Sequence, residues 1–232
     1  MTTILIATRN LHKVGEIEAI LGEGFQMLTL KDFPEAPKVV EDAETFAGNA
    51  RKKAEQLTKW LEAKPARMSH QPALAFVLAD DSGLEVDALN GAPGVHSARF
   101  AAPGNQENST DADNNAKLLR LLGDLAPEKR TARFRCVVAL ARFAIPELSP
   151  ANASPVCHWE APAAETPVFD GVCEGKIIQA GSGNGGFGYD PLFVPAGFDQ
   201  TFAELGDEIK NRLSHRAKAL AQLKDYFNRL AI

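Results

Sequence analysis

Along the chain, short apolar runs alternate with segments in which apolar residues recur every three or four positions. Apolar runs of this length are typical of buried strands, and three occur early in the chain, at residues 4–7, 25–30 and 74–79. Spacing of three and four is typical of helices that bury one face, and it occurs in residues 14–21, 46–61, 115–122 and 213–230. Gly22 and Gly123 directly follow two of these segments, where helices commonly end.

A long segment of strict alternation dominates the second half of the chain. Between residues 131 and 143, the apolar side chains at even positions face one way, whereas Arg133 and Arg135 face the other. This pattern predicts a strand with one buried face. Residues 168–180 are predicted to be the returning strand. The proline-rich residues 146–167 between them are predicted to be a hairpin tip or a surface insertion, not a domain boundary.

The order of these elements predicts an α/β fold in a single elongated domain, residues 1–232. Helices alternate with strands at first, as in parallel strands joined by helical crossovers, and long antiparallel strands follow. We therefore expect a long mixed β-sheet flanked by helices, with two lobes around a central cleft. Residues 65–72 are predicted to be a surface connection.

The composition limits the classes of function. Of the 232 residues, 45% are hydrophobic and 24% are charged, as in ordinary globular proteins, and the net charge is −5. A general nucleic-acid-binding protein needs a basic surface, so no nucleic-acid partner is expected, whereas an anionic small molecule needs only a local cluster of cations. No apolar run approaches the roughly 20 residues that span a bilayer, and no basic signal region precedes the first strand, so we expect a cytoplasmic protein with no membrane partner. The three cysteines (Cys136, Cys157 and Cys173) lack C-x-x-C spacing, which argues against a disulfide framework or a zinc site.

The segment Thr8-Arg9-Asn10-Leu11-His12-Lys13 connects the first predicted strand to the first predicted helix. Such turns place backbone N–H groups and the positive end of a helix dipole where a phosphate can bind. This turn adds a hydroxyl, an amide and an ammonium group. The alternative is an ordinary N-cap formed by Thr8 or Asn10, with Lys13 in solvent. The turn is not a Walker A loop, because G-x-x-x-x-G-K-[ST] does not occur in the chain.

Asp80 and Asp81 follow an apolar run and are therefore expected at the carboxyl end of a buried strand, where α/β sheets bind ligands. Two adjacent carboxylates repel each other and do not enter a core unpaired. Because side chains alternate along a strand, one carboxylate can face the cleft while its neighbour points elsewhere or bridges through a metal. The functional interpretation is coordination of Mg²⁺ and activation of a water. The alternative is a loop N-cap with an exposed acid.

A glycine-rich segment, Gly181-Ser182-Gly183-Asn184-Gly185-Gly186, matches the dinucleotide-binding pattern G-x-G-x-x-G. That pattern requires a helix directly after it, but Phe187-Gly188-Tyr189-Asp190-Pro191 follows, so a nicotinamide-dependent dehydrogenase is the less favoured interpretation. A flexible loop that presents Phe187 and Tyr189 for stacking against a base fits the residues better. The alternative is that these aromatic residues belong to the core.

Near the C-terminus, Ser214-His215-Arg216 is predicted to open the last helix, and Lys210 precedes this motif by four residues. These side chains are candidates to donate hydrogen bonds to a base that carries a carbonyl group. Taken singly, each is equally well explained as a solvated surface residue. Thr201-Phe202-Ala203-Glu204 has the spacing of a capping box, and we interpret it as structural.

Six short motifs follow one another along the chain: Thr8-x-Asn10-x-x-Lys13, Thr45-Phe46-x-x-Asn49-Ala50-x-x-Lys53-Ala54, Asp80-Asp81-Ser82-Gly83-Leu84-x-Val86-Asp87-Ala88-Leu89-x-Gly91-x-Pro93-Gly94, Ser97-Ala98-Arg99-Phe100, Gly185-Gly186-Phe187-Gly188-Tyr189-Asp190-Pro191 and Ser214-His215-Arg216. Together, and in this order, they resemble the Ham1-like inosine/xanthosine triphosphate pyrophosphatases from Ile4 to about Leu223. One departure is Arg9, which stands where that family commonly has glycine.

The resemblance implies a homodimeric enzyme that cleans the nucleotide pool. Its reaction would be the Mg²⁺-dependent hydrolysis of non-canonical purine nucleoside triphosphates (ITP, dITP, XTP) to the monophosphate and pyrophosphate. Asp81 is the implied catalytic base, and Asp81, Glu41 and Asp80 are the implied metal ligands. The implied substrate-binding residues are Thr8, Arg9, Asn10, Leu11, His12, Lys13, Lys53, Ser82, Phe187, Gly188, Tyr189, Asp190, Lys210, His215 and Arg216. A non-catalytic nucleotide sensor is the alternative, although it has little need for two adjacent aspartates.

A mechanism follows from the charge of such a substrate. A triphosphate carries about four negative charges, so its cleavage needs cations more than covalent chemistry. Lys13 and Lys53, with Mg²⁺, are expected to neutralise the leaving pyrophosphate while Asp81 takes a proton from the water that attacks the α-phosphorus. Arg216 and His215 are expected to donate to the 6-carbonyl of hypoxanthine or xanthine and to reject the 6-amino group of adenine.

Overall fold

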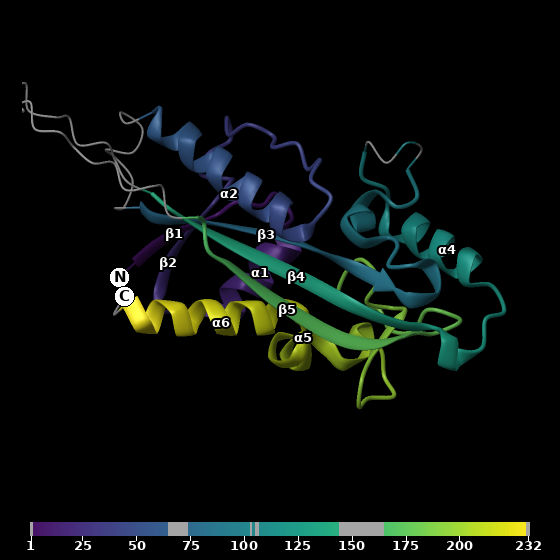
Figure 1. The fold of residues 1–232 in the computed structure, drawn as a ribbon. Coiled ribbons are helices and arrows are strands. Elements are labelled where there is room, and N and C mark those ends of the chain that lie inside the picture. The colour runs from purple at the N-terminus through teal and green to yellow at the C-terminus, as the bar shows by residue number, and fades with distance from the viewer. Residues whose placement is uncertain (1, 65–73, 103, 105–106, 144–164, 231–232) are drawn as a thin grey trace, which may run out of the picture.

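The computed structural model describes residues 2–64, 74–102, 104, 107–143 and 165–230. The predicted connection 65–72, most of the predicted insertion 146–167 and Cys157 lie outside these residues. A six-stranded sheet in the order β2-β1-β3-β4-β5-β6 runs through the molecule (Figure 1). Its strands are β1 (Thr2–Ile6), β2 (Phe25–Thr29), β3 (Leu74–Val86), β4 (Thr131–Arg142), β5 (Val168–Ile177) and β6 (Phe193–Pro195). β1 pairs in parallel with β2 and β3, and the remaining pairs are antiparallel, which confirms the predicted mixed sheet.

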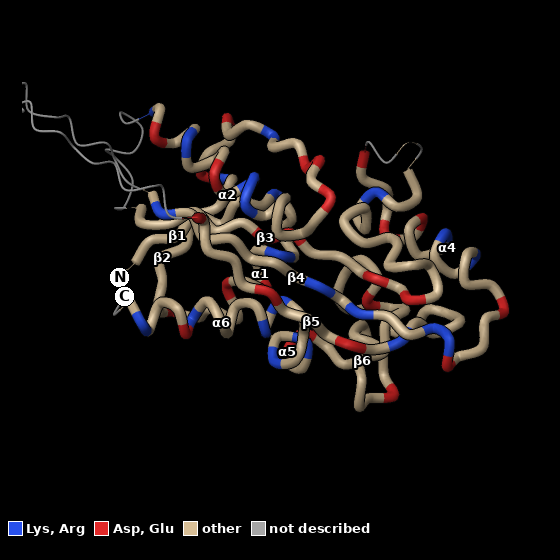
Figure 2. Tube along the Cα trace, in the orientation of Figure 1, with Lys and Arg blue, Asp and Glu red and all other residues tan. Residues whose placement is uncertain are grey.

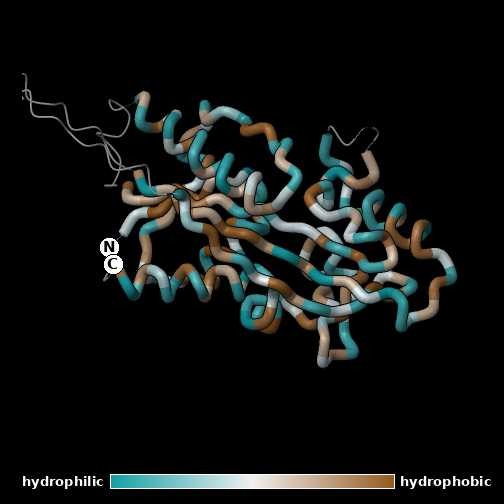
Figure 3. Tube along the Cα trace, in the orientation of Figure 1, coloured by the Kyte–Doolittle hydropathy of each residue, from teal (hydrophilic) through white to brown (hydrophobic). Residues whose placement is uncertain are grey.

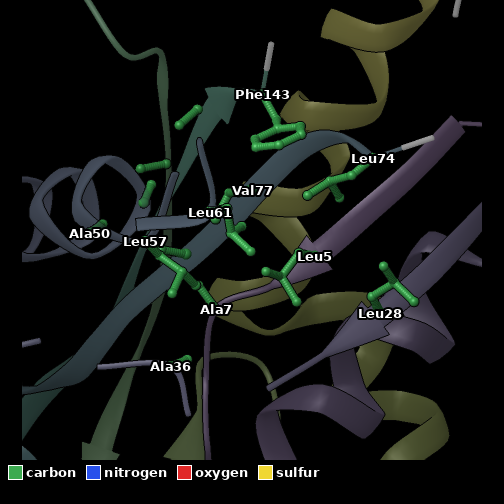
Figure 4. Packing of buried hydrophobic residues seen from close by; sticks show 14 of the residues in the cluster. Leu5, Ala7, Leu28, Ala36, Ala50, Leu57, Leu61, Leu74, Val77 and Phe143 are labelled. Carbon is green, nitrogen blue, oxygen red and sulfur yellow. The ribbon is translucent and has the colours of Figure 1, made fainter. Parts of the chain in front are cut away.

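Helices cover both faces of this sheet, with α2 on one face and α1 and α6 on the other (Figure 1). The helices are α1 (Leu11–Leu21), α2 (Phe46–Glu62), α4 (Asp111–Leu122), α5 (Phe202–Leu213) and α6 (His215–Leu230), with short 3₁₀ helices η1 (Asp87–Leu89), η2 (Gly94–Arg99) and η4 (Pro127–Lys129). Because strand side chains alternate, Val77 and Ala79 of β3 pack toward α2, whereas Leu78 packs toward α1 and α6. Figure 4 shows the α2 side, where Leu5 and Leu57 surround Val77.

β3 is longer than its apolar run predicted. It continues for 13 residues, which is about 43 Å of extended chain. Asp80 and Asp81 therefore lie in the middle of the strand, and the prediction that they end it is wrong. β1 stops pairing with β3 at Ile6, opposite Leu78, so residues 80–83 of β3 pair with β4 on one side and extend past the end of β1 on the other. The aspartates thus lie at the carboxyl end of β1, where ligand sites of α/β sheets are found.

The C-terminal part of the chain forms two helices, and the last one begins at the Ser214-His215-Arg216 motif, as predicted. α5 begins with a capping box between Thr201 and Glu204, as predicted. Ser214 leaves the helical conformation, with ψ of 165°, and α6 begins directly after it at His215. Gly171 of β5 permits the close approach of α6, since a Cβ at that position would lie 1.9 Å from the carbonyl oxygen of His215. The start of α6 is therefore held tightly against the sheet.

Arginines of β4 lie beside acidic residues of β5 and η1 toward the end of the molecule that carries α4 (Figure 2). Arg133 contacts Asp87 at 2.9 Å and Glu174 at 3.0 Å, and Arg135 contacts Asp170 at 2.6 Å. The prediction that these two arginines face away from the buried side of the strand is confirmed.

Hydrophobic residues concentrate in the strands, whereas hydrophobic and hydrophilic residues alternate along α6 (Figure 3). α6 buries Ala219, Leu220, Leu223 and Phe227 against the sheet. Within the described ranges, no helix is both long enough and apolar enough to cross a membrane.

Candidate active site

A cleft of about 340 Å³ lies where β1 ends. It is bounded by the turn after β1, the loop before α2, the middle of β3, the loop after β5 and the start of α6. The predicted site residues that line it are Thr8, Arg9, Asn10, Lys13, Glu41, Lys53, Asp81, Ser82, Phe187, Gly188, Tyr189, Asp190, Lys210, His215 and Arg216. Leu11, His12 and Asp80 are the predicted residues that are not among its lining. The structure therefore joins the turn, the catalytic candidate and the C-terminal motif in one cleft.

The turn after β1 caps helix α1. The Asn10 Oδ1 atom accepts the backbone N–H groups of His12, at 2.9 Å, and of Lys13, at 3.3 Å. The Thr8 hydroxyl accepts the N–H of Asn10 at 3.2 Å. The N-cap interpretation of Asn10 is thus confirmed, and three backbone donors of the turn, those of Asn10, His12 and Lys13, are already used. The side chain of Leu11 is 57% exposed, so it does not contribute to the cleft.

Asp80 is buried beneath the cleft and fully paired. Its carboxylate contacts Lys13 from α1 and accepts the Arg216 Nε–H at 3.2 Å, and the Cys136 thiol lies 2.9 Å away. Burial alone would raise the pKa of this carboxyl group, but Arg216 and Lys13 outweigh it and hold the pKa far below its ordinary value. Asp80 is therefore an anion that anchors cations, and its expected role as a metal ligand does not fit the structure.

Asp81 points to the opposite side of β3, toward α2. Its carboxylate accepts the Asn49 Nδ2–H at 3.2 Å and lies 3.4 Å from the Lys53 ammonium. Burial raises the pKa of Asp81, and the nearby Glu41 and Asp80 carboxylates add to this effect against the attraction of Lys53. An acid with a raised pKa is suited to accept a proton.

Lys53 connects the carboxylates of this side. Its ammonium donates to the Asp80 carbonyl oxygen at 2.6 Å, on the part of β3 that extends past β1, and lies 3.3 Å from Glu41 Oε2. Burial would lower the pKa of Lys53, but Asp81, Glu41 and Asp80 together raise it, so the side chain stays charged. A fixed cation thus lies between Glu41 and Asp81.

The loop that carries Glu41 is tied down by arginines from two other elements. Arg9 of the turn after β1 donates to the Ala36 carbonyl oxygen at 2.6 Å. Arg99 of η2 donates to the Glu41 carbonyl oxygen at 3.0 Å. Both arginines also line the cleft. Arg9, which departs from the family's common glycine, therefore holds this loop against the turn.

The loop after β5 forms another wall of the cleft. Asp190 accepts the backbone N–H of Phe187 at 2.8 Å and the Lys210 ammonium at 2.5 Å. Tyr189 is only 4% exposed and donates its hydroxyl to the Ser97 carbonyl oxygen at 2.9 Å, and burial raises its pKa. Of the two aromatic residues expected to stack on a base, Tyr189 therefore belongs to the core and Phe187 alone is partly exposed. No helix follows the glycine-rich segment before α5, which removes the dinucleotide-binding alternative.

Two side chains of helix α4 form hydrogen bonds with the backbone of the same loop at Gly188. The Gly188 N–H donates to Asp111 Oδ2 at 2.7 Å, and Asn115 Nδ2 donates to the Gly188 carbonyl oxygen at 3.0 Å. Gly188 has φ of 64°, a conformation that favours glycine. These bonds fix the backbone next to Phe187.

Glu16 lies beneath the C-terminal motif and joins its two cations. One oxygen of its carboxylate contacts the Lys210 ammonium at 2.7 Å, and the other pairs with Arg216. Burial would raise the pKa of Glu16, but Arg216 and Lys210 outweigh it and lower the pKa. Arg216 Nη2 also donates to the Ser82 hydroxyl at 2.9 Å. Most donors of this arginine are therefore used inside the protein.

His215 is buried and stacks on Phe134 with ring centroids 4.8 Å apart. Burial, together with the nearby Arg216 and Lys210 cations, lowers its pKa well below the ordinary value, so the ring is neutral at pH 7. Its Nδ1 atom has no hydrogen-bond partner among the described residues. His215 lines the cleft, and this buried nitrogen is a polar group whose hydrogen-bonding capacity is unused within the described residues.

Glu16, Asn49, Asp111 and Asn115 are among the residues of the site that were not predicted from the sequence. Glu16 could have been recognised from the sequence, because it is an acidic residue next to Ile17 on the buried face of α1. Asn49 could have been recognised in a similar way, as an amide on the buried face of α2 and inside a recognised motif. No sequence pattern indicates Asp111 and Asn115, since both bind the backbone of Gly188, which is far along the chain.

Comparison with known proteins agrees with this geometry. The family model described as "Ham1 family" matches residues 4–226. The chain belongs to the Ham1 family. Among its relatives, the dITP/XTP pyrophosphatase of Geobacter sulfurreducens is 44% identical, covering 97% of this chain and 96% of its own length. The dITP/XTP pyrophosphatase of Geobacillus kaustophilus is 43% identical, covering 99% and 96%.

Solved structures of the Ham1 family have the same fold. A HAM1 protein from Coxiella burnetii superimposes with a TM-score of 0.74 at 33% identity, covering 99% of this chain and 100% of the other. The Staphylococcus aureus Ham1 protein gives a TM-score of 0.73 at 32% identity, covering 98% of each chain. The recognition made from the six motifs and the predicted α/β fold are both confirmed.

Proposed function

We propose that this Ham1-family chain hydrolyses non-canonical purine nucleoside triphosphates (ITP, dITP and XTP) to the nucleoside monophosphate and pyrophosphate, and so cleans the nucleotide pool. The observation that carries the proposal is the position of Asp81. This acid with a raised pKa lies in a cleft that also holds Lys13, Lys53 and the aromatic wall of Phe187. Relatives that are 43–44% identical and named dITP/XTP pyrophosphatase support the substrate class.

The turn after β1 with the start of α1, and helix α2, supply the residues that act on the phosphate groups. Lys13 and Lys53 bind the phosphate oxygens and stabilise the charge of the leaving pyrophosphate, because cleavage of a triphosphate depends mainly on electrostatic stabilisation. Asp81 accepts the proton of the water that attacks the α-phosphorus. Asn49 holds the Asp81 carboxylate in position through its 3.2 Å hydrogen bond.

The residues at this part of the cleft fit a divalent cation at Asp81 and Glu41. Both carboxylates lie within 3.4 Å of one ammonium group, that of Lys53, so they already converge on a positive charge. Mg²⁺ commonly takes only one or two protein carboxylates and completes its shell with water and substrate phosphates. Accordingly, no cluster of three or more metal-binding side chains is found in the described part of the chain. When bound, Mg²⁺ would neutralise phosphate charge and polarise the phosphorus.

The loop after β5, the end of α5 and the start of α6 supply the residues that contact the purine base. Hypoxanthine and xanthine present a carbonyl group at position 6, whereas adenine presents an amino donor. Lys210, His215 and Arg216 line this part of the cleft. Arg216 already binds Glu16, Asp80 and Ser82. We therefore assign the main contact with the 6-carbonyl to the neutral ring of His215, in the tautomer that carries its proton toward the base.

We further propose that the enzyme is a homodimer, as its family resemblance implies, and that it is cytoplasmic, as its sequence pattern led us to expect. Light scattering on the purified chain tests the dimer. A molar mass twice that of the chain supports it, and the mass of a single chain contradicts it. Fractionation of cells that express a tagged chain tests the location.

The experiment that tests the function is release of pyrophosphate from ITP, dITP, XTP, GTP and ATP, with Mg²⁺ and after removal of divalent metal by EDTA. The proposal predicts pyrophosphate and monophosphate as products, a preference for ITP, dITP and XTP, and loss of turnover with EDTA. Binding of ITP without turnover would instead support a nucleotide sensor, and turnover that persists in EDTA would contradict the role of Mg²⁺.

A further inference from the structure

The ring of Phe187, expected to receive the purine base, is already covered in this structure. The His12 imidazole stacks against it with ring centroids 5.2 Å apart and an angle of 15° between the planes. The Lys210 ammonium also lies over the ring, 4.5 Å from its centroid. His12 is not among the residues that line the cleft, but its imidazole covers one face of the Phe187 ring, and a base can stack on that face only if the imidazole moves.

Phe187 and Lys210 are both held in place. Lys210 is 2% exposed and is bound by Asp190 at 2.5 Å and Glu16 at 2.7 Å. The backbone N–H of Phe187 donates to Asp190, and the backbone of the next residue, Gly188, is hydrogen-bonded to two side chains of α4. Moving any of these groups would break buried ion pairs or hydrogen bonds, which is costly.

His12 is the neighbour that moves easily. It lies on the first turn of α1 and is exposed. Its backbone N–H is used by the Asn10 cap, but within the described residues its ring makes no hydrogen bond or ion pair. The stack on Phe187 is its one ring contact there, and rotation of the side chain into solvent gives up that contact alone.

We infer that His12 occupies the stacking place of the base on Phe187 in the free protein and is displaced when a nucleotide binds. The inference deepens the proposed function and rests on it. His12 thereby sets the affinity for the base, because each nucleotide must replace the imidazole before it can stack. His12 also lies next to Lys13, so its displacement occurs on the same helical turn that receives the phosphates. This assigns the His12 side chain to the base side, although the resemblance placed it on the triphosphate.

Isothermal titration calorimetry with IMP tests the inference without turnover and without metal. His12→Ala should bind IMP about 2- to 10-fold more tightly than the wild type, since an aromatic pair no longer has to be broken. His12→Phe keeps a ring on Phe187 and should bind IMP no more tightly than the wild type. Tripolyphosphate, which has no base, should bind His12→Ala and the wild type equally. On a Phe187→Ala background, His12→Ala should change nothing.

Two outcomes overturn the inference. Weaker binding of IMP by a folded His12→Ala variant would mean that His12 clamps the base. Equal binding would mean that the ring does not compete with it. These failures are distinct from failure of the proposed function, which would appear as a wild-type protein that releases no pyrophosphate from ITP.

Discussion

Asp80 and Asp81 are neighbours in sequence that lie on opposite faces of β3, and their pKa values are shifted in opposite directions. Burial acts on both carboxyl groups. For Asp80 it is outweighed by Arg216 and Lys13, whereas for Asp81 it is reinforced by two nearby carboxylates. Pairs of acids whose environments separate their pKa values commonly divide the work of a site. Here Asp80 is the permanent anion that orders the surrounding cations, and Asp81 is the proton acceptor.

Asp81→Asn tests this division of roles. The amide keeps the shape of the side chain and an oxygen for the hydrogen bond from Asn49, so the fold should persist. Loss of the base should lower kcat for ITP by about 10²- to 10⁴-fold with a modest change in KM. Asp42→Asn is the matched control, because Asp42 lies on the loop before α2 with a side chain that is 64% exposed. Equal turnover by Asp81→Asn and Asp42→Asn would remove Asp81 from its role.

Glu16→Gln should lower stability in a pH-dependent way. At pH 7 the variant should lose roughly 3–5 kcal/mol of unfolding free energy, because the buried Lys210 and Arg216 cations lose their shared anion. The pKa of Glu16 is lowered in the folded state, so the stability it contributes is present above its ordinary value of 4.5 and is lost as the pH falls through the folded pKa. The difference between the wild type and Glu16→Gln should therefore shrink in acid.

Urea denaturation of both proteins between pH 3 and pH 7 measures this difference. Glu18→Gln, an exposed substitution on the same helix, is the control and should unfold like the wild type at each pH. A difference that stays constant or grows toward pH 3 would contradict the assignment of Glu16 as a buried anion.

Loss of the hydrogen bonds between α4 and the Gly188 backbone should weaken substrate binding more than it slows the chemical step. Asn115→Ala removes one hydrogen bond to the loop next to the base and should raise KM for ITP about 2- to 10-fold, with a smaller effect on kcat. Asp111→Asn keeps an oxygen that can accept the Gly188 N–H, so it should raise KM less than Asp111→Ala. Arg120→Ala, on the exposed side of α4, controls for the helix. A fall in kcat at unchanged KM would show that these hydrogen bonds position the reacting groups instead of the base.

His215→Phe tests the selection of the base. Phenylalanine can keep the stack on Phe134 but has no ring nitrogen to meet the 6-carbonyl. The ratio of kcat/KM for ITP to that for ATP should fall by roughly 5- to 150-fold, the value of one buried hydrogen bond. Thermal unfolding of the variant checks that the start of α6 remains folded. An unaltered ratio would place the selector on another residue, with Arg216 the next to test.

Local patterns were sufficient for much of this fold. The alternation along β4 and the apolar runs at β1 and β2 required only that one or both faces be buried. Gly22 ends α1 as predicted, with φ of 73°. The start of the last helix at Ser214-His215-Arg216 was predicted as well, and α6 begins at His215.

The middle of β3 could not be predicted for a different reason. Two adjacent acids look like the end of a buried strand unless their counter-charges are known, and Arg216 lies 136 residues away from Asp80. The same holds for Glu16, whose partner Arg216 is 200 residues away. Motif resemblance brought the cleft residues together, but only the folded chain shows that Asp80 is paired and that His12 faces Phe187.

The central claim is that a water activated by Asp81 attacks the α-phosphorus of a purine nucleoside triphosphate. The most direct measurement is hydrolysis of ITP by the wild-type enzyme in ¹⁸O-labelled water, with mass spectrometry of both products. The account predicts one labelled oxygen in IMP and none in pyrophosphate. Label in pyrophosphate, or release of labelled inorganic phosphate, would contradict it.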